Sequence, residues 1–219
     1  ISYEDFKDIK YDNSFLSKFN YSFMDISIIE KLKIDPDNDL FEILDIIQKW
    51  NRKTDINSQG AGIYGVLYYQ LVSNYRNEIL ENDNTVSKET LLSALSDIKS
   101  YLTDNFGTIN ITLGDFQKLV RGDKEIPIWG LPDVVTAMSS RPYKDGRRKV
   151  TQGESYIGLI RFNDKGPTIE SIISFGNSDN PDSEHYTDQM ELYSKFKTKK
   201  MTFDKQEIYS KAKRIYNPN

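Results

Sequence analysis

The chain has 219 residues, of which 37% are hydrophobic, 28% are charged and 12% are aromatic, a composition typical of a folded domain rather than a disordered segment. The formal net charge of −4 excludes an overall basic field, so no nucleic-acid partner is expected. Cysteine is absent, which excludes disulfides, thiolate catalysis and cysteine-ligated zinc, and no apolar run reaches the ~20 residues of a membrane span.

The first half of the chain is predicted to be mainly helical. Ser2 can cap a helix whose first turn carries Asp5, because a carboxylate suits the positive end of a helix. Residues 12–33 are aromatic and apolar and are also predicted to be helical, with breaks that the sequence does not locate. Pro36 predicts a turn, since proline forces the preceding residue out of the helical region.

Three further segments carry apolar residues at helical spacing. They are residues 40–50, residues 59–80 with Ile63, Leu67 and Leu71 on one face, and a helix capped by Ser87 that carries Leu91, Leu95, Ile98 and Leu102. Glycines at 60, 62 and 65 weaken the second helix, and they allow a neighbouring element to approach closely.

The pattern changes after Gly107. Proline and glycine crowd the stretch that follows, so residues 106–150 are predicted to be irregular, with short strands and one short helix near 132–140. "ESYIGLIRF" and "PTIESIISFG" are predicted to form a β hairpin over 154–176, joined by "NDKG" with Gly166 at positive φ. Both strands carry apolar residues on both faces, which predicts packed layers on both sides.

A last helix is expected to open with a capping box formed by Asp204 and Glu207. The order of elements therefore predicts an α+β fold. It comprises a helical part, 1–105, and a mixed part, 106–219, with the hairpin and a C-terminal helix. We expect both parts to form one structural unit of a larger layered protein.

"FGNSDNPDSEHYTDQMEL", residues 175–192, contains the only histidine, His185. A Ser-His-Asp triad would have to use this imidazole with Asp188 or Asp182, but the chain has no G-x-S-x-G nucleophile elbow. One histidine among scattered acids is a weak metal-ligand set. The favoured interpretation is a histidine that forms hydrogen bonds within a turn.

Three other motifs carry little functional information. "DPDNDLFEI" resembles a calcium loop, but Leu40 replaces its glycine and Ile46 replaces its final glutamate, so a polar helix start is expected. "RGD" at 121–123 is too short a match to indicate adhesion. "GRRKV" at 146–150 is interpreted as a solvated basic loop.

Glu154 stands at the start of the apolar strand in "TQGESYIGLI". A carboxylate at a strand end can be held rigidly and partly desolvated, which suits orienting a histidine or tuning a base. The alternative is a glutamate that only bonds local backbone amides.

Four segments, read together, resemble a known family. They are "GDFQKLVRGDKEIPIWGLPDVVTAM", "GESYIGLIRF", the glycine after "IISF", and "GNSDNPDSEHYTDQMELY". Their order and spacing resemble the C-terminal part of the β chain of penicillin acylase-like amidohydrolases, a family that includes penicillin, cephalosporin, aculeacin and acyl-homoserine lactone acylases. The last segment is the most specific, and it matches the family pattern at Gly176, Asn177, Ser178, Asn180, Pro181, Ser183, His185, Tyr186, Asp188 and Gln189.

The resemblance extends to "YEDFKDIKYDNS" and "IIQKWNRKTDINSQGAGIYGVLY", and so covers nearly the whole chain. It implies the C-terminal portion of a four-layer αββα sandwich of the N-terminal-nucleophile type, with a periplasmic or secreted location. In that family a precursor cleaves itself and exposes a serine, whose hydroxyl attacks an amide carbonyl while its own α-amine acts as the base. An asparagine side chain and a backbone amide form the oxyanion hole.

The resemblance also implies that the nucleophile is not in this chain. The first residue is Ile1, and the family's serine, oxyanion asparagine and calcium ligands lie upstream of the part that this sequence resembles. We therefore expect a C-terminal fragment that is inactive alone and carries no cofactor or metal. Its partners would be the rest of the acylase, namely the α chain and the N-terminal part of the β chain, and a small acyl amide substrate.

Glu154 matches the position of a C-terminal glutamate that orients a histidine in some cephalosporin-type members of the family. By the same resemblance, His185 belongs to a structural turn that holds the final strand. The alternative function is a non-catalytic binding or interaction domain with an aromatic ligand surface, because a chain rich in tyrosine and phenylalanine without a nucleophile fits that class as well.

Overall fold

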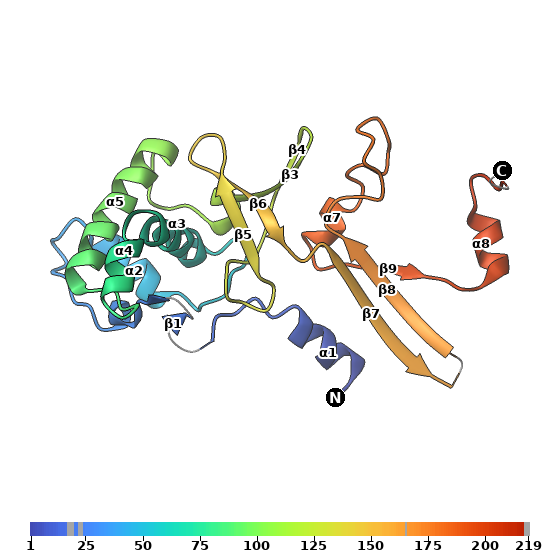
Figure 1. Cartoon of the computed structure of the whole chain (residues 1–219), viewed down its shortest axis with the longest axis horizontal. Helices are drawn as coiled ribbons and strands as arrows, with labels where there is room; N and C mark the ends of the chain where they lie inside the picture. Colours follow the sequence, from blue (N-terminus) through green and yellow to red (C-terminus); the bar gives the residue numbers. More distant parts are fainter. Residues whose placement is uncertain (17–19, 22–23, 165, 217–219) are drawn as a thin grey trace. The chain divides into compact units, whose positions relative to one another are not determined.

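The computed structural model describes residues 1–16, 20–21, 24–164 and 166–216. The chain divides into two compact units, Ser2–Glu154 and Ser155–Asn219 together with Ile1. Both units contain helices and strands, as expected of an α+β protein (Figure 1). The sequence predicts a change from a helical to a mixed part near residue 106, whereas the boundary between the compact units falls between Glu154 and Ser155.

The first unit contains most of the helices. Its elements are α1 (Tyr3–Lys10), β1 (Asn20–Tyr21), β2 (Met24–Asp25), the 3₁₀ helix η1 (Ser27–Glu30), α2 (Phe41–Lys49), α3 (Gln59–Asn74), α4 (Arg76–Glu81), α5 (Lys88–Phe106), α6 (Leu113–Phe116), β3 (Gln117–Arg121), β4 (Lys124–Pro127), β5 (Met138–Pro142) and β6 (Arg148–Gly153). The second unit contains β7 (Tyr156–Asn163), β8 (Gly166–Ile173), α7 (Met190–Tyr193), β9 (Lys199–Met201) and α8 (Lys205–Lys211). Among the described residues, no helix combines the length and the apolar character needed to cross a bilayer.

The N-terminal helix forms as predicted. The Ser2 hydroxyl accepts a hydrogen bond from the Asp5 N–H at 3.0 Å, and the Asp5 carboxylate accepts one from the Ser2 N–H at 2.9 Å. This reciprocal capping box satisfies two amides that a helix start would otherwise leave unpaired.

The predicted helix across residues 12–33 is wrong for the residues that the structure describes there. Its described parts form the β1–β2 pair and η1, and residues 17–19 and 22–23 lie outside the described residues. The reason lies in Asp25. Its carboxylate accepts the N–H two residues later at 2.8 Å, and its backbone N–H bonds to the Asn84 carbonyl at 2.6 Å. Such bonds offer the backbone an alternative to helix formation.

Helices α2, α3 and α5 pack together around the core of the first unit (Figure 1). The predicted apolar positions of α3 and α5 are fully buried. However, α3 ends at Asn74 instead of continuing to residue 80. Tyr75 leaves the helical conformation, with φ of −119° and ψ of 9°, and its phenol donates a 2.7 Å hydrogen bond to Asp97 on α5. A new helix, α4, then begins at Arg76.

The glycines of α3 allow close approach, as predicted. A Cβ on Gly60 would lie 2.4 Å from the Trp50 side chain, and one on Gly62 would lie 2.7 Å from the Ile111 carbonyl oxygen. The helix therefore packs directly against a ring on one side and a backbone segment on another. The Trp50 ring in turn stacks on Tyr64 of the same helix, with centroids 5.0 Å apart.

The sheet of the first unit has the order β4-β3-β6-β5, in which β3 and β6 are parallel and the other pairs are antiparallel. The predicted short helix near 132–140 is wrong, because turns occupy that segment and β5 begins at Met138. Asp133 has a φ of +66° and Gly130 a φ of +86°, values that a right-handed helix does not contain. The short helix of this region is α6, ahead of β3.

The second unit is built on the predicted hairpin. Strands β7 and β8 pair antiparallel up to Asn163 and Gly166, and Gly166 adopts the predicted positive φ, +103°. The sheet order is β7-β8-β9 (Figure 1). One face buries Ile157, Leu159 and Ile172, and α7 packs against β8.

The opposite face of this hairpin is open. Tyr156, Ile160 and Phe162 alternate along β7 on that face and are exposed, with Phe162 79% accessible. Met201 of β9 lies on the same face, because it pairs with Ile169, which pairs with Ile160. Among the described residues of the Ser155–Asn219 unit, packing on both faces of the hairpin, as the sequence predicts, is therefore not present.

Helix α8 begins at the predicted cap, but only half of the capping box forms. The Asp204 carboxylate accepts from the Glu207 N–H at 3.0 Å. The Glu207 carboxylate binds Thr202 and Lys211 instead of the Asp204 N–H, which donates to the Thr202 hydroxyl at 3.1 Å. The hydroxyl of Thr202, two residues ahead of the N-cap Asp204, thus replaces the second arm of the box.

Candidate functional site

The segment from Gly176 to Gln189 folds back on itself as a compact turn. The Ser178 N–H donates to the His185 carbonyl at 3.1 Å, and the Gln189 N–H donates to the Phe175 carbonyl at 2.8 Å. A Cβ on Gly176 would lie 2.0 Å from the same His185 carbonyl oxygen, so no other residue fits there without moving backbone. The two ends of the segment are therefore held together by main-chain contacts.

The buried side chain of this turn is Gln189. It is 3% exposed, and its side-chain oxygen accepts the Ile173 N–H at the end of β8, at 3.3 Å. Gln189 is also the N-cap of α7, which starts with the next residue. One amide side chain thus joins the final residue of β8 to the start of the helix that packs on it.

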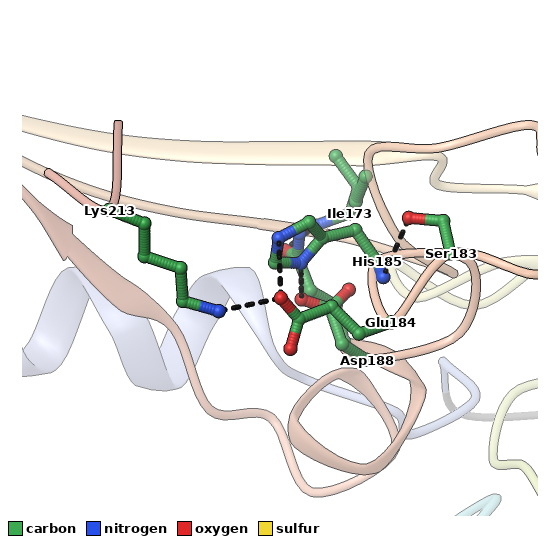
Figure 2. Close-up of polar contacts among 7 residues, drawn as sticks. Ile173, Ser183, Glu184, His185, Asp188 and Lys213 are labelled. Carbon is green, nitrogen blue, oxygen red and sulfur yellow. Dashed lines mark hydrogen bonds and ion pairs between the residues drawn. The ribbon is translucent and has the colours of Figure 1, made fainter. Parts of the chain in front are cut away.

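The His185 ring lies on the outside of the turn, and Figure 2 shows its partners. Its Nδ1 atom is 3.1 Å from Asp188 Oδ2, and its Nε2 atom is 3.7 Å from Glu184 Oε1. The nearby Ser183 hydroxyl accepts the backbone N–H of His185 at 3.2 Å. In a Ser-His-Asp triad the imidazole bonds to the nucleophilic hydroxyl, and here it does not. The side chain of His185 is 55% exposed, so water also competes for its bonds.

One of the two acidic groups beside the histidine is engaged by a lysine. Lys213 approaches Glu184 at 2.6 Å, and this hydrogen bond lowers the pKa of the Glu184 carboxyl (Figure 2). In the part of the chain that the structure describes, no three His, Asp or Glu side chains gather closely enough to hold a metal ion. The geometry of the turn supports a structural role for its polar groups.

Glu154 follows β6 at the end of the first unit. Its carboxylate forms an ion pair with Lys10 of α1, and both side chains are about three-quarters shielded from solvent. Lys10 also lies 5.6 Å from the centroid of the Tyr11 ring. The carboxylate is thus partly desolvated and held by a lysine, a partner that no pattern in the sequence indicates. Its function as an orienting acid stays a prediction.

Two of the weak motifs have structural explanations. "RGD" forms the β3–β4 connection, in which Gly122 has a φ of +58° and Arg121 pairs with Lys124. In "DPDNDLFEI", the Asp35 carboxylate accepts the Asp37 N–H at 3.0 Å, so the segment begins as a turn and runs into α2 at Phe41.

The interpretation of "GRRKV" as a solvated loop is wrong at Arg148. This residue is the first of β6, is half-buried, and stacks on the Tyr69 ring with its guanidinium carbon 3.6 Å from the ring centroid. The signal that sequence reasoning missed is the alternation of a strand, in which Arg148 and Val150 share one face and Lys149 takes the other.

Comparisons with known proteins agree on one family. A family model described as penicillin amidase matches residues 1–210. Acyl-homoserine lactone acylase PvdQ of Pseudomonas syringae pv. syringae (strain B728a) is 38% identical over 98 residues, and PvdQ of Pseudomonas fluorescens (strain Pf0-1) is 35% identical over 98 residues. Each match covers 43% of this chain, and the chain spans 13% of the length of either relative.

Among solved structures, a thermostable penicillin G acylase from Alcaligenes faecalis aligns with 88% of this chain and 46% of its own. The TM-score is 0.42 and the sequence identity is 15%.

Proposed function

The chain belongs to the penicillin amidase family, and from this premise we propose that it is the C-terminal part of an acylase that hydrolyses a linear amide bond. The single observation that carries the proposal is the match over residues 1–210, nearly the whole chain. The substrate class is an N-acyl amide. This proposal follows the names of the relatives, acyl-homoserine lactone acylases, and of the family, penicillin amidase, since both denote enzymes that cleave N-acyl amides.

The nucleophile of the proposed reaction is an N-terminal serine supplied by a segment outside this sequence. Its hydroxyl attacks the amide carbonyl, its α-amine takes the proton, and the amine of the substrate leaves. Water then hydrolyses the acyl-enzyme. The small share of its relatives that the chain spans, 13%, supports a larger enzyme around it.

The open face of the β7–β8 hairpin supports the same proposal. Tyr156, Ile160, Phe162 and Met201 together form an exposed apolar surface on one side of a sheet whose other side is buried. Exposed apolar patches of this kind mark surfaces that another protein layer covers. The proposed cover is the remainder of the acylase, its α chain and the N-terminal part of its β chain.

Glu154 is proposed as a positioning residue for a histidine of that remainder. The ion pair with Lys10 supports a fixed carboxylate orientation, because a lysine partner restricts the rotamers of the glutamate. We propose a periplasmic or secreted location on the family resemblance, which cell fractionation with an antibody against this chain would test.

The direct test uses the natural full-length reading frame. Expression of that frame should give an enzyme that releases acid from N-acyl-homoserine lactones or from penicillin-type amides, and sequencing of its chains should find a new N-terminal serine. Replacement of that serine by alanine should abolish hydrolysis. The 219-residue chain alone should show no burst of product with an activated acyl amide.

Hydrolysis by this chain alone, or a full-length protein without a processed serine, would overturn the assignment. A full-length protein that binds acyl amides without cleaving them would instead support the alternative of a binding domain with an aromatic ligand surface.

A further inference from the structure

The first unit contains a pocket that the proposed acyl transfer does not use. Its volume is about 210 Å³. The lining comes from α3, α5, α6 and the strands β5 and β6, and consists of Val66, Tyr69, Gln70, Ser73, Tyr101, Phe116, Pro142 and Arg148. Most of these side chains are aromatic or aliphatic, so the pocket has apolar walls and one cationic group.

The cationic group is fixed in position by its neighbours. The Arg148 guanidinium stacks on Tyr69, its Nε donates to the Ser140 hydroxyl at 3.1 Å, and one Nη donates to the Ser140 carbonyl at 2.5 Å. Tyr69 is held in turn, because its phenol oxygen accepts the Ser140 N–H at 3.0 Å and the Ser140 hydroxyl at 3.1 Å. The pocket is thus pre-organised around a guanidinium that cannot turn away.

Arg148 retains unused hydrogen-bonding capacity. A guanidinium has five N–H groups, and two of them are engaged by Ser140. Within the described ranges of the chain, no Asp or Glu lies within salt-bridge distance of Arg148. Partial burial lowers the pKa of its guanidinium, since desolvation disfavours the charged form. A half-buried charge without a counter-ion is unfavourable unless an anion completes it.

Tyr69 supplies a second donor. Its oxygen accepts both bonds from Ser140, so the phenol hydrogen is left for another acceptor. The other phenol, Tyr101, is already used, because it donates to the Gly146 carbonyl at 2.5 Å. The Arg148 guanidinium and the Tyr69 hydroxyl therefore both offer donors to a ligand, and the neutral polar side chains of Gln70 and Ser73 also line the pocket.

We propose that this pocket binds a small monocarboxylate with an apolar body. A carboxylate matches the fork of the guanidinium and accepts from both donors. The walls formed by Val66, Phe116 and Pro142 accommodate an aromatic or branched aliphatic group. The volume lies below the roughly 300–1,000 Å³ of sites that hold drug-sized ligands, so the ligand is of single-ring size.

The proposal is independent of acyl transfer and goes beyond the function proposed above. Its test measures binding rather than catalysis, so it succeeds or fails whether or not the full-length protein hydrolyses amides.

The probes are benzoate and its neutral isostere benzamide, titrated by calorimetry or ligand-observed NMR into the natural full-length protein. Benzoate should bind more tightly than benzamide by about 10-fold to 100-fold. This ratio of dissociation constants corresponds to the free energy of a hydrogen bond to a charged group. Acetate should bind more weakly than benzoate, because it leaves the apolar walls uncovered.

Variants locate the site. Arg148→Gln should remove the preference for benzoate over benzamide. The matched control is Lys149→Gln, which removes one positive charge from the next position of β6, on the other face of the strand, and should leave the preference unchanged. Ser73→Phe offers a second route should Arg148→Gln fail to fold. Ser73 lies on the exposed side of α3 at the pocket, so the larger ring should block both probes without disturbing the core.

Equal affinity for benzoate and benzamide, or an unchanged preference in Arg148→Gln, would refute the proposal. Failure of the full-length protein to bind benzoate would refute it as well. The same applies if a carboxylate from another part of the full-length protein is found paired with Arg148, since the guanidinium would then be satisfied within the protein.

Discussion

Replacing Gly176 with alanine should destabilise the Ser155–Asn219 unit by about 3 kcal/mol. The added Cβ would lie 2.0 Å from the His185 carbonyl oxygen and 2.8 Å from its carbonyl carbon, so the main chain must move. Overpacking of this kind costs about 1–3 kcal/mol, and contact with rigid backbone favours the upper end. The movement also weakens the bond from Ser178, worth about 1 kcal/mol. Alanine also lowers the conformational entropy of the unfolded chain, which offsets about 0.4–1 kcal/mol of this destabilisation.

The matched comparison is His185→Ala. It removes a solvent-exposed ring whose hydrogen bond to Asp188 is worth at most about 1 kcal/mol, while every main-chain contact of the turn remains. Urea unfolding followed by circular dichroism measures both free energies, and hydrogen exchange at the amides of Ile173, Ser178 and Gln189 reports the turn itself. For a chain of this size, the Gly176→Ala melting temperature should fall by about 6–12 °C.

A free energy of unfolding of Gly176→Ala within about 0.5 kcal/mol of the wild-type value would refute the reasoning. A change that small is typical of a surface substitution without steric conflict. A larger loss in His185→Ala than in Gly176→Ala would show that the imidazole, and not the main chain, holds the turn.

Three further predictions concern the first unit. In the full-length enzyme, Glu154→Gln should lower kcat by at least about tenfold while the melting temperature changes little, and unchanged steady-state kinetics would remove Glu154 from the site. Gly62→Ala should destabilise the protein by about 2 kcal/mol, because its Cβ would meet backbone at 2.7 Å, whereas Gly65→Ala, with side-chain contacts at 3.3 Å, should be neutral or stabilising by up to about 1 kcal/mol in thermal unfolding. The hydrogen bond to Asp97 raises the pKa of Tyr75 to about 12 from 10.0, so the folded state holds this proton more tightly and stability should fall as pH rises from 10.0 to about 12. The free energy of unfolding, measured across this pH range, should fall less in Tyr75→Phe than in the wild type. An identical pH profile in the variant would contradict the assignment.

Local chemistry explains which elements the sequence could predict. The caps at Ser2, Ser87 and Asp204 form because each side chain reaches an amide two or three residues away. Gly166 follows the same logic, since its positive φ belongs to a tight turn within one hairpin. These interactions depend on neighbours in the sequence and need no knowledge of the rest of the fold.

The errors occur where distant segments decide the outcome. Asp25 bonds to the backbone at Asn84, so its segment is not helical despite an apolar composition. Arg148 is half-buried because Tyr69 of α3 provides a stacking surface, and strand alternation around the arginine indicates a shared face with Val150 but not this aromatic partner. Of the candidate site, the position of Glu154 directly after a strand can be predicted from the sequence, but its pairing with Lys10 requires the fold.

The order β7-β8-β9 leaves β7 with a hydrogen-bonded neighbour on one side only, within the residues that the structure describes. Its eight residues contain no proline, and Arg161 is the one charged residue among them that can discourage further pairing. The outer backbone groups of this strand can therefore template the addition of another strand, from the same enzyme or from a second molecule. Edge-to-edge aggregation is therefore the expected liability of the isolated chain.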